Sequence, residues 1–225
     1  KALGSDHPLI LSYLGSLSEL YKSQGRYTDA EPLYKRILAI NAKVFGLDHY
    51  GNTEALNNLA GLYQAQGRYA DAEPLLKRAL AIQEKAFGLD HPSVAAFLHN
   101  LGRIYHDQGY FNEAEPLLKR ALLIDEKALG PDHPDIAISL NSLAGLYQGQ
   151  SRYADAEPLY KRSLVIKEKA LGPDHPGVAL SLNNLAGLYQ GQGRYADAEP
   201  LYKRSLAIKE KALGPDHPGV ALSLN

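Results

Sequence analysis

The chain has 225 residues, and its 24 lysine and arginine residues balance 25 aspartate and glutamate residues to a formal net charge of −1. This balance excludes the general electrostatic attraction to nucleic acids or acidic membranes that a strongly basic chain would exert. The chain contains no cysteine, which excludes disulfides, thiol catalysis and cysteine-based metal sites.

Membrane and secretion signals are also missing from the sequence. No apolar run approaches the roughly 18 residues that a membrane span needs. The first residues, KALGSDHP, lack the apolar core of a signal peptide. We therefore expect a cytoplasmic protein with no membrane partner.

A repeat of 42 residues organises the whole sequence. Residues 175–216 repeat residues 133–174 with 36 of 42 letters unchanged, and the same frame continues toward both ends without insertion or deletion. A fixed period of this size indicates stacked repeats that share one continuous core. We expect a single array over residues 1–225, with full repeats beginning at His7, His49, His91, His133 and His175 and a partial sixth beginning at His217.

The first helix predicted in each repeat spans residues 176–192 of the fifth copy. Pro176 suits the first turn of this helix, and Asp174 or His175 lies where an N-cap belongs. Gly193 then provides the positive φ that ends a helix. The apolar stripe of the helix is formed by Val178, Leu182, Leu185, Ala186 and Tyr189.

A second helix follows over residues 195–213 and ends at Gly214. Pro200 is tolerable only in or next to the first turn, and otherwise predicts a slight kink. Glutamate precedes lysine by four residues on the exposed side of this helix, which favours an ion pair. The pairs are Glu31/Lys35, Glu73/Lys77, Glu115/Lys119, Glu157/Lys161 and Glu199/Lys203.

Two residues depart from the repeat pattern at helix ends. The second copy has Tyr50 where most others have proline, so its first helix loses the fixed φ at its start. The fourth copy has Ser151 where glycine should end the first helix. Ser151 must adopt a strained left-handed conformation, or the turn must change.

The motifs at fixed spacing resemble those of tetratricopeptide (TPR) repeats. Leucine at 182 and 185, alanine at 186 and tyrosine at 189, followed by glycine at 193, match the paired-helix TPR pattern, although Leu182 replaces the usual tryptophan and the usual late proline is absent. The longer repeat, with NNLAGLY, QGRY, AEPL and LGPDHP, resembles those of kinesin light chains and bacterial TPR arrays. The resemblance covers essentially the whole chain and implies an all-α fold, an α-solenoid forming a right-handed superhelix. It also implies that the first helices line a concave groove for peptides or partner proteins.

One polar face of each first helix lies away from the apolar stripe and is the candidate groove. Asparagine suits a groove because its amide both donates to and accepts from a peptide backbone. The alternative is that these amides bond only to adjacent helices or water. The candidate residues are Asn57, Asn58, Gln64, His99, Asn100, Arg103, His106, Asn141, Gln148, Asn183, Asn184 and Gln190.

The third repeat carries the basic part of this face. His99 and His106 could suggest a metal pair, but they lie two helical turns apart and Arg103 between them would repel a cation. An acidic side chain of a bound peptide is the better functional reading, with a solvated surface as the alternative. TPR modules that bind chaperone tails use a clamp of lysine, asparagine and arginine here. In this chain only Lys22 and Arg103 resemble such cations, and their separation by two repeats argues against that specialised ligand.

Two other recurring patterns have structural explanations. The six Asp-His pairs, from Asp6/His7 to Asp216/His217, are spread along the array at helix entries, whereas an active site is one convergent cluster. No nucleotide-binding, metalloprotease or hydrolase motif is present. The Lys-Arg pairs of the second helices could form a nucleic-acid stripe, but a glutamate precedes each lysine by four residues, which favours a solvated outer face.

We therefore expect a non-enzymatic protein–protein interaction scaffold without metal or cofactor, binding a peptide or protein in the groove and no nucleic acid. The alternative is a self-assembling array that stacks end to end, because neither end carries a polar capping helix. The partial repeat from His217 carries Val220, Leu222 and Leu224 without a second helix to cover them. Homo-association is the partner expected from this alternative.

Overall fold

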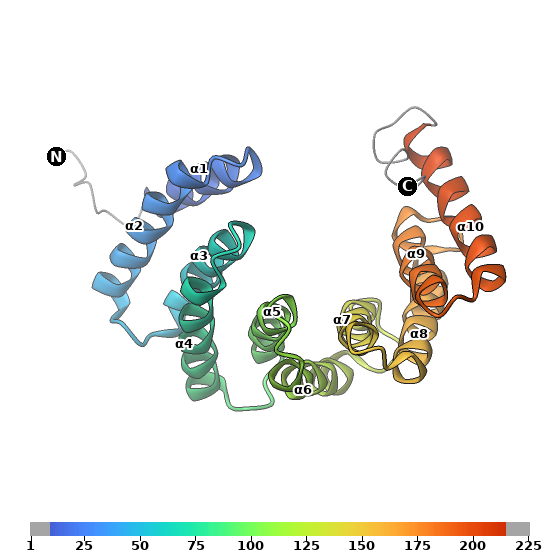
Figure 1. Ribbon diagram of the computed structural model, residues 1–225. Helices are drawn as coiled ribbons and strands as arrows, with labels where there is room; N and C mark the ends of the chain where they lie inside the picture. Colours follow the sequence, from blue (N-terminus) through green and yellow to red (C-terminus); the bar gives the residue numbers. More distant parts are fainter. Residues whose placement is uncertain (1–9, 215–225) are drawn as a thin grey trace. The chain divides into compact units, whose positions relative to one another are not determined.

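The structure is a computed structural model that describes residues 10–214 (Figure 1). The described part consists of helices without strands, in the order expected from the repeat. The beginning of the first repeat at His7 and the partial repeat from His217, with Val220, Leu222 and Leu224, lie outside the described residues. So do the two outermost Asp-His pairs.

The described helices belong to two compact units, which divide between Tyr110 and Phe111. The expected single array therefore stays a prediction. The first unit contains α1 (Leu11–Ser23), α2 (Tyr27–Phe45), the 3-10 helix η2 (Tyr50–Asn52), α3 (Thr53–Ala65), α4 (Tyr69–Phe87) and α5 (Pro92–Asp107). The second unit contains α6 (Phe111–Leu129), α7 (Ile136–Gly149), α8 (Tyr153–Leu171), α9 (Pro176–Gly191) and α10 (Tyr195–Leu213).

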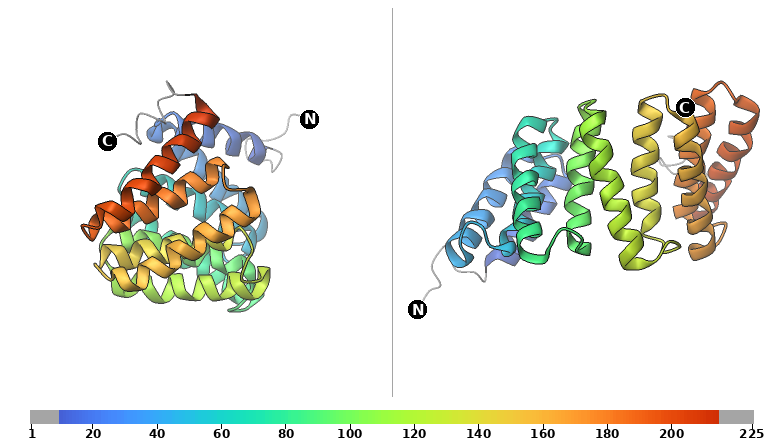
Figure 2. Two further views of the ribbon diagram at one scale, coloured as in Figure 1. Left: turned by 90° about the vertical axis from the view of Figure 1, so that its right-hand side faces the viewer. Right: turned by 90° about the horizontal axis from the view of Figure 1, so that it is seen from below.

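Within each unit, every helix packs against its neighbours in sequence (Figure 2). The core is therefore a row of small clusters rather than one centre, and each cluster joins three helices. The cluster around α7 contains the buried residues Ile136, Ala137, Leu140 and Ile166, with Leu122 and Leu159 packed against it. The cluster around α9 repeats it 42 residues later with Val178, Ala179, Leu182 and Ile208, and with Leu164 and Leu201.

Histidine side chains cap the first helices. The Nδ1 atom of His175 accepts a hydrogen bond of 3.0 Å from the backbone N–H of Gly177, and Nδ1 of His91 accepts one of 3.2 Å from Ser93. Asp174 forms an ion pair with Lys211 instead, at 3.0 Å. The histidine of the described Asp-His pairs is thus the cap, because it satisfies a backbone donor that the helix leaves open.

The helix after Tyr50 starts late, but the loss of proline does not decide this alone, because α7 (Ile136–Gly149) also begins two residues after Pro134. α5 and α9 begin at Pro92 and Pro176, whereas residues 50–52 form η2 and α3 begins only at Thr53. His49 still caps this turn, with Nδ1 accepting from the backbone N–H of Gly51 at 3.1 Å. The second helices, by contrast, tolerate their proline. Pro200 lies in the second turn of α10, and the helix continues beyond it to Leu213.

Ser151 takes the left-handed conformation that the sequence predicts, with φ of 58°. Gly193 occupies the same place one repeat later, with φ of 72°. We expect Ser151→Gly to raise the free energy of unfolding by about 1 kcal/mol, because glycine adopts this conformation without a Cβ clash. Urea unfolding monitored by circular dichroism measures the change. The reciprocal Gly193→Ser should cost a similar amount, and stabilisation by both substitutions would contradict the explanation.

Candidate functional site

A tight turn joins the two helices of each repeat, and in every described repeat except the third, which has Tyr110, it returns an arginine to the first helix. Between α3 and α4, the N–H of Arg68 donates to the carbonyl of Tyr63 at 2.8 Å, and that of Gly67 donates to Gln64 at 2.9 Å. This is the Schellman arrangement, which glycine permits. It places the guanidinium carbon of Arg68 4.1 Å from the centre of the Tyr63 ring.

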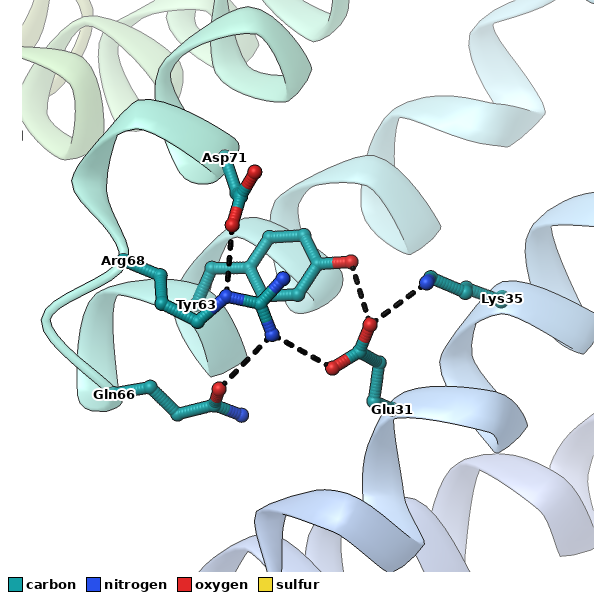
Figure 3. A network of polar contacts seen from close by, with 6 residues as sticks. All are labelled: Glu31, Lys35, Tyr63, Gln66, Arg68 and Asp71. Atoms are coloured by element: carbon teal, nitrogen blue, oxygen red, sulfur yellow. Dashed lines mark hydrogen bonds and ion pairs between the residues drawn. The ribbon is translucent and has the colours of Figure 1, made fainter.

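A glutamate from the preceding repeat completes a polar network around this arginine (Figure 3). Glu31 of α2 accepts from the Tyr63 hydroxyl at 3.0 Å and from Nη1 of Arg68 at 2.8 Å. Lys35 lies 2.7 Å from the same carboxylate, and Nε of Arg68 donates to Asp71 at 2.7 Å. The network therefore joins α2 to α3 and to the start of α4.

The second unit contains the same network twice. Its glutamates are Glu115 and Glu157, which accept hydrogen bonds from the tyrosine and arginine of the next repeat. We call this arrangement the Glu–Tyr–Arg network; its complete copies are Glu31/Tyr63/Arg68, Glu115/Tyr147/Arg152 and Glu157/Tyr189/Arg194. The predicted Glu–Lys pairs are confirmed as ion pairs, but all except the last also belong to contacts between repeats.

The network holds its carboxylates in the ionised form. The hydrogen bond from Lys35 lowers the pKa of Glu31 to about 2, against the opposing effect of partial burial, and Arg68 and Tyr63 add to the lowering. The pKa values of Glu73, Glu115 and Glu157 are lowered as well, each first by the lysine four residues later. Ionised carboxylates accept hydrogen bonds more strongly than neutral ones, so folding and ionisation support each other.

Two copies of the network are incomplete. Glu73 is bonded to Tyr105 and Lys77, but Tyr110 stands where the other copies have arginine. Glu199 of α10 is bonded to Lys203 alone among the described residues. Within one chain, the glutamate at this position therefore contacts tyrosine, arginine and lysine in three repeats, tyrosine and lysine in a fourth, and, among the described residues, lysine alone in α10.

The arginines of the Lys-Arg pairs also join successive repeats. In the second unit, Arg162 bonds to Glu126 at 2.5 Å and to the carbonyl of Pro131 at 2.7 Å, and Arg204 bonds to Glu168 and Pro173 in the same way. The outer face expected from the sequence to be merely solvated therefore holds structural contacts. These arginines are occupied, which weakens a nucleic-acid role further.

The polar face of the first unit surrounds a cavity of about 170 Å³ between α1, α3 and α5. Lys22 and Arg103 both line it, although two repeats separate them in sequence. Their separation by two repeats, which in the sequence argues against the ligand of chaperone-tail clamps, therefore does not keep these two cations apart. The remaining lining residues are Asn57, Asn58, Gly61, Gln64, Leu76 and Asn100.

Hydrogen bonds arrange the side chains around this cavity. Asn100 donates to Oδ1 of Asn57 at 2.7 Å. Gln64 accepts from Arg103 at 2.9 Å and donates to Asp107 at 2.9 Å. Lys22 lies 3.6 Å from Glu19, the carboxylate of its own helix. The amides thus bond to adjacent helices, as the alternative reading expects, and in doing so they hold the cations beside the cavity.

His99 and His106 do not line this cavity. His106 lies 3.3 Å from Asp107, its neighbour in sequence. No group of three or more histidine, aspartate or glutamate side chains in residues 10–214 could hold a metal ion. Within the same range, no helix combines the length and the low charge that a bilayer span requires.

The polar face of the second unit is less charged. Asn141, Gln148, Asn183 and Asn184 are half-buried and Gln190 is exposed. The Tyr160 and Tyr202 hydroxyls donate to Gln148 and Gln190, at 3.0 and 2.7 Å. Two apolar side chains, Ile138 and Leu180, are 61% and 56% exposed on the corresponding helices α7 and α9. Thus the candidate residues of α7 and α9 surround no cation like Lys22 or Arg103.

Family models of the tetratricopeptide repeat match residues 10–50, 52–127, 98–169, 135–211 and 178–225. The chain belongs to the tetratricopeptide repeat family. The expected TPR-like repeat is thereby confirmed. No match was found among curated proteins.

Several solved structures share the fold. The nearly identical TPR-like repeats of a kinesin light chain from Podosopora anserina are 32% identical, cover 92% of this chain and 98% of that chain, and have a TM-score of 0.77. BtubC (BKLC) from P. vanneervenii is 24% identical over 93% of this chain and 83% of its own, with a TM-score of 0.79. MamA is 20% identical, covers 92% of this chain and 96% of its own, and has a TM-score of 0.56.

These likenesses confirm an all-α repeat solenoid of the kind found in kinesin light chains. TPR repeats are protein–protein interaction scaffolds in general, and such scaffolds are generally non-enzymatic. The sequence identified the residues of the polar face from helical periodicity. It did not identify the Glu–Tyr–Arg network, although the recurrence of all three residue types every 42 positions was a signal that could have found it.

Proposed function

We propose that this TPR chain is a scaffold that binds an acidic segment of a partner protein on the polar face of α1, α3 and α5. The observation that carries the proposal is the shared cavity of Lys22 and Arg103. Two cations beside one concave surface attract carboxylates, and the arginine can bind one with two parallel hydrogen bonds.

The amides around the cavity suit the backbone of such a segment. Asn58 and Asn100 are half-buried and line the cavity between the cations. Gly61 offers no side chain there, and a Cβ at this position would meet only Nζ of Lys22, at 3.7 Å. An extended chain could therefore approach α3 closely between the two charges.

Panning a displayed library of random peptides on the wild-type chain tests the proposal. We expect enrichment of acidic peptides, and we expect Arg103→Glu combined with Asn100→Ala to weaken their binding at least tenfold, because each charge-assisted hydrogen bond is worth about 1.5 kcal/mol or more. Lys22→Ala should weaken binding of the same peptides and, among the described residues, removes only the 3.6 Å ion pair with Glu19. Lys203→Glu on α10 is the control, because it changes the net charge as Arg103→Glu does but Lys203 does not line the cavity.

Circular dichroism must show unchanged helicity in each variant. Undiminished binding by both groove variants, or an equal loss in Lys203→Glu, would contradict the proposal. Enrichment of neutral or basic peptides would contradict the proposed preference for acidic segments, but it would not contradict the role as a scaffold.

End-to-end association of copies of this chain is the second candidate, and the contacts of Arg26 and Glu199 among the described residues favour it. Arg26 stacks on Tyr21 at 4.1 Å and bonds to Asp29 at 2.8 Å, as its counterparts do inside the array. Glu199 of α10 carries the complementary carboxylate, bonded to Lys203. A second copy could join these two halves. Sedimentation showing one unchanging monomer up to millimolar concentration would contradict this candidate.

A further inference from the structure

The second helix of each repeat carries a polar residue near its end, and in α2, α4 and α6 this residue bonds to a first helix or its entry. Asn41 of α2 donates to the carbonyl of Gly51 at 3.2 Å. Asp125 of α6 accepts from the hydroxyl of Ser139 at 2.5 Å. Lys167 occupies the same position of α8. With Gln83 of α4, which accepts a hydrogen bond from Thr53, three repeats therefore show a hydrogen bond from this position.

Lys167 lacks such a contact. It is half-buried, and the structure gives it no hydrogen bond or ion pair among the described residues. Ser163 and Leu171, one turn before and after it on α8, offer no carboxylate. Ser181, the counterpart of Ser139, is fully buried and its Oγ has no hydrogen-bond partner within the described part of the chain. The hydrogen bond between Asp125 and Ser139 therefore has no counterpart between Lys167 and Ser181.

The other lysines of the second helices behave differently. Glu157 bonds to Lys161, on the same helix as Lys167, and this hydrogen bond raises the pKa of the Lys161 amine. Partial burial lowers the pKa of the Lys167 amine, and no acidic group opposes this effect. At a given pH the neutral, nucleophilic form is therefore more populated at Lys167 than at Lys161.

We propose that Lys167 is a lysine acylation site whose co-reactant is an acyl thioester. The neutral amine attacks the thioester carbonyl carbon, and a C–N bond forms as the C–S bond breaks. The thiolate leaves with the electron pair, and the amine proton passes to solvent. The product is an amide, and no oxidant or reductant is needed.

The repeat itself indicates why the acylated form suits this position. Acylation removes a charge that is partly desolvated and has no counter-ion. To accept from the Ser181 hydroxyl, the acyl-lysine carbonyl must fold back toward α9, because it lies four bonds farther along its side chain than the Asp125 carboxylate that accepts from Ser139. Gln83, at the same position of α4, accepts from the Thr53 hydroxyl at 3.3 Å, so with Asn41 this position already accommodates a neutral amide twice in this chain.

Competitive labelling tests the proposal. The folded chain is treated at pH 8 with a limiting amount of an acetyl thioester, and acetylation of each lysine is quantified by peptide mass spectrometry relative to the urea-unfolded chain. We expect at least threefold greater modification at Lys167 than at Lys161. Equal or lower modification at Lys167 would overturn the proposal.

Two variants distinguish the effect of the missing carboxylate partner of Lys167 from the effect of its solvent accessibility. Ala170 is exposed on α8, one turn after Lys167, and Ala170→Glu places a carboxylate beside the amine. We expect labelling of Lys167 to fall to the level of Lys161, which itself stays constant. Lys167→Gln, which imitates the acylated side chain, should raise the urea midpoint, whereas Lys161→Gln should lower it. Unchanged labelling in Ala170→Glu, or a lower midpoint for Lys167→Gln, would contradict the inference.

Discussion

Replacing Glu157 by glutamine is expected to lower the free energy of unfolding by roughly 2 kcal/mol. The carboxylate is 22% exposed and accepts from Tyr189 and Arg194 of the next repeat as well as from Lys161. Removing its charge leaves half-buried donors without an ionised acceptor, which costs more than losing an exposed ion pair. Urea unfolding of the whole chain, followed by circular dichroism, measures the loss.

The same chain supplies graded controls for this substitution. Glu199 has the same place in α10, but bonds only to Lys203 and is 65% exposed, so Glu199→Gln should change stability little. Glu73→Gln should give an intermediate loss, because Tyr110 replaces the arginine of that network. Equal losses at residues 157 and 199 would show that the contact between repeats contributes nothing beyond the helical ion pair.

Acid is expected to destabilise the fold through the same carboxylates. The folded-state pKa of Glu31 is about 2, against an ordinary value of 4.5. A group with a depressed folded pKa contributes stability above its unfolded pKa, and that contribution is lost as the pH falls through the window between the two values. Solvent screening of the partly exposed side chain reduces the contribution to about 1–2 kcal/mol. With Glu73, Glu115 and Glu157 shifted in the same direction, the chain should lose several kcal/mol between about pH 4.5 and pH 2.

Urea midpoints measured across this range test the assignment. The triple variant Glu31→Gln, Glu115→Gln and Glu157→Gln should be less stable at pH 6 and should show a much flatter pH dependence below pH 4.5. Glu199→Gln should retain the wild-type slope. An unchanged slope in the triple variant would assign acid sensitivity to other carboxylates.

Local rules were enough to predict the helices of each repeat. His175, Pro176 and Gly193 predict α9 to within one residue of its observed end. Ser151 was expected in the left-handed region because its neighbours in the frame are glycines, and it lies there. Tyr50 shows the limit of this reasoning, since the loss of proline predicted a weaker helix start but not the 3-10 turn that replaces it.

Sequence patterns within a single helix or turn could not predict the contacts between repeats. Glu31 meets residues 32 and 37 positions later, and the bond to Arg68 depends on a turn that folds this residue back over Tyr63. The glutamate was recognised only through Lys35, its neighbour on the helix. The convergence of Lys22 and Arg103 depends on how α1, α3 and α5 pack, because helical periodicity gives a residue's face but not its distance from another helix.

Site-specific photo-crosslinking tests the central claim most directly. A photoreactive amino acid is placed at Gln64 or Asn58, beside the cavity of the first unit, or at Lys203 of α10, and each chain is irradiated with an acidic peptide selected by panning. The proposal predicts efficient crosslinks from positions 58 and 64 and none above background from position 203. Crosslinking that is equal at all three positions, or strongest at 203, would contradict a partner-binding face on α1, α3 and α5.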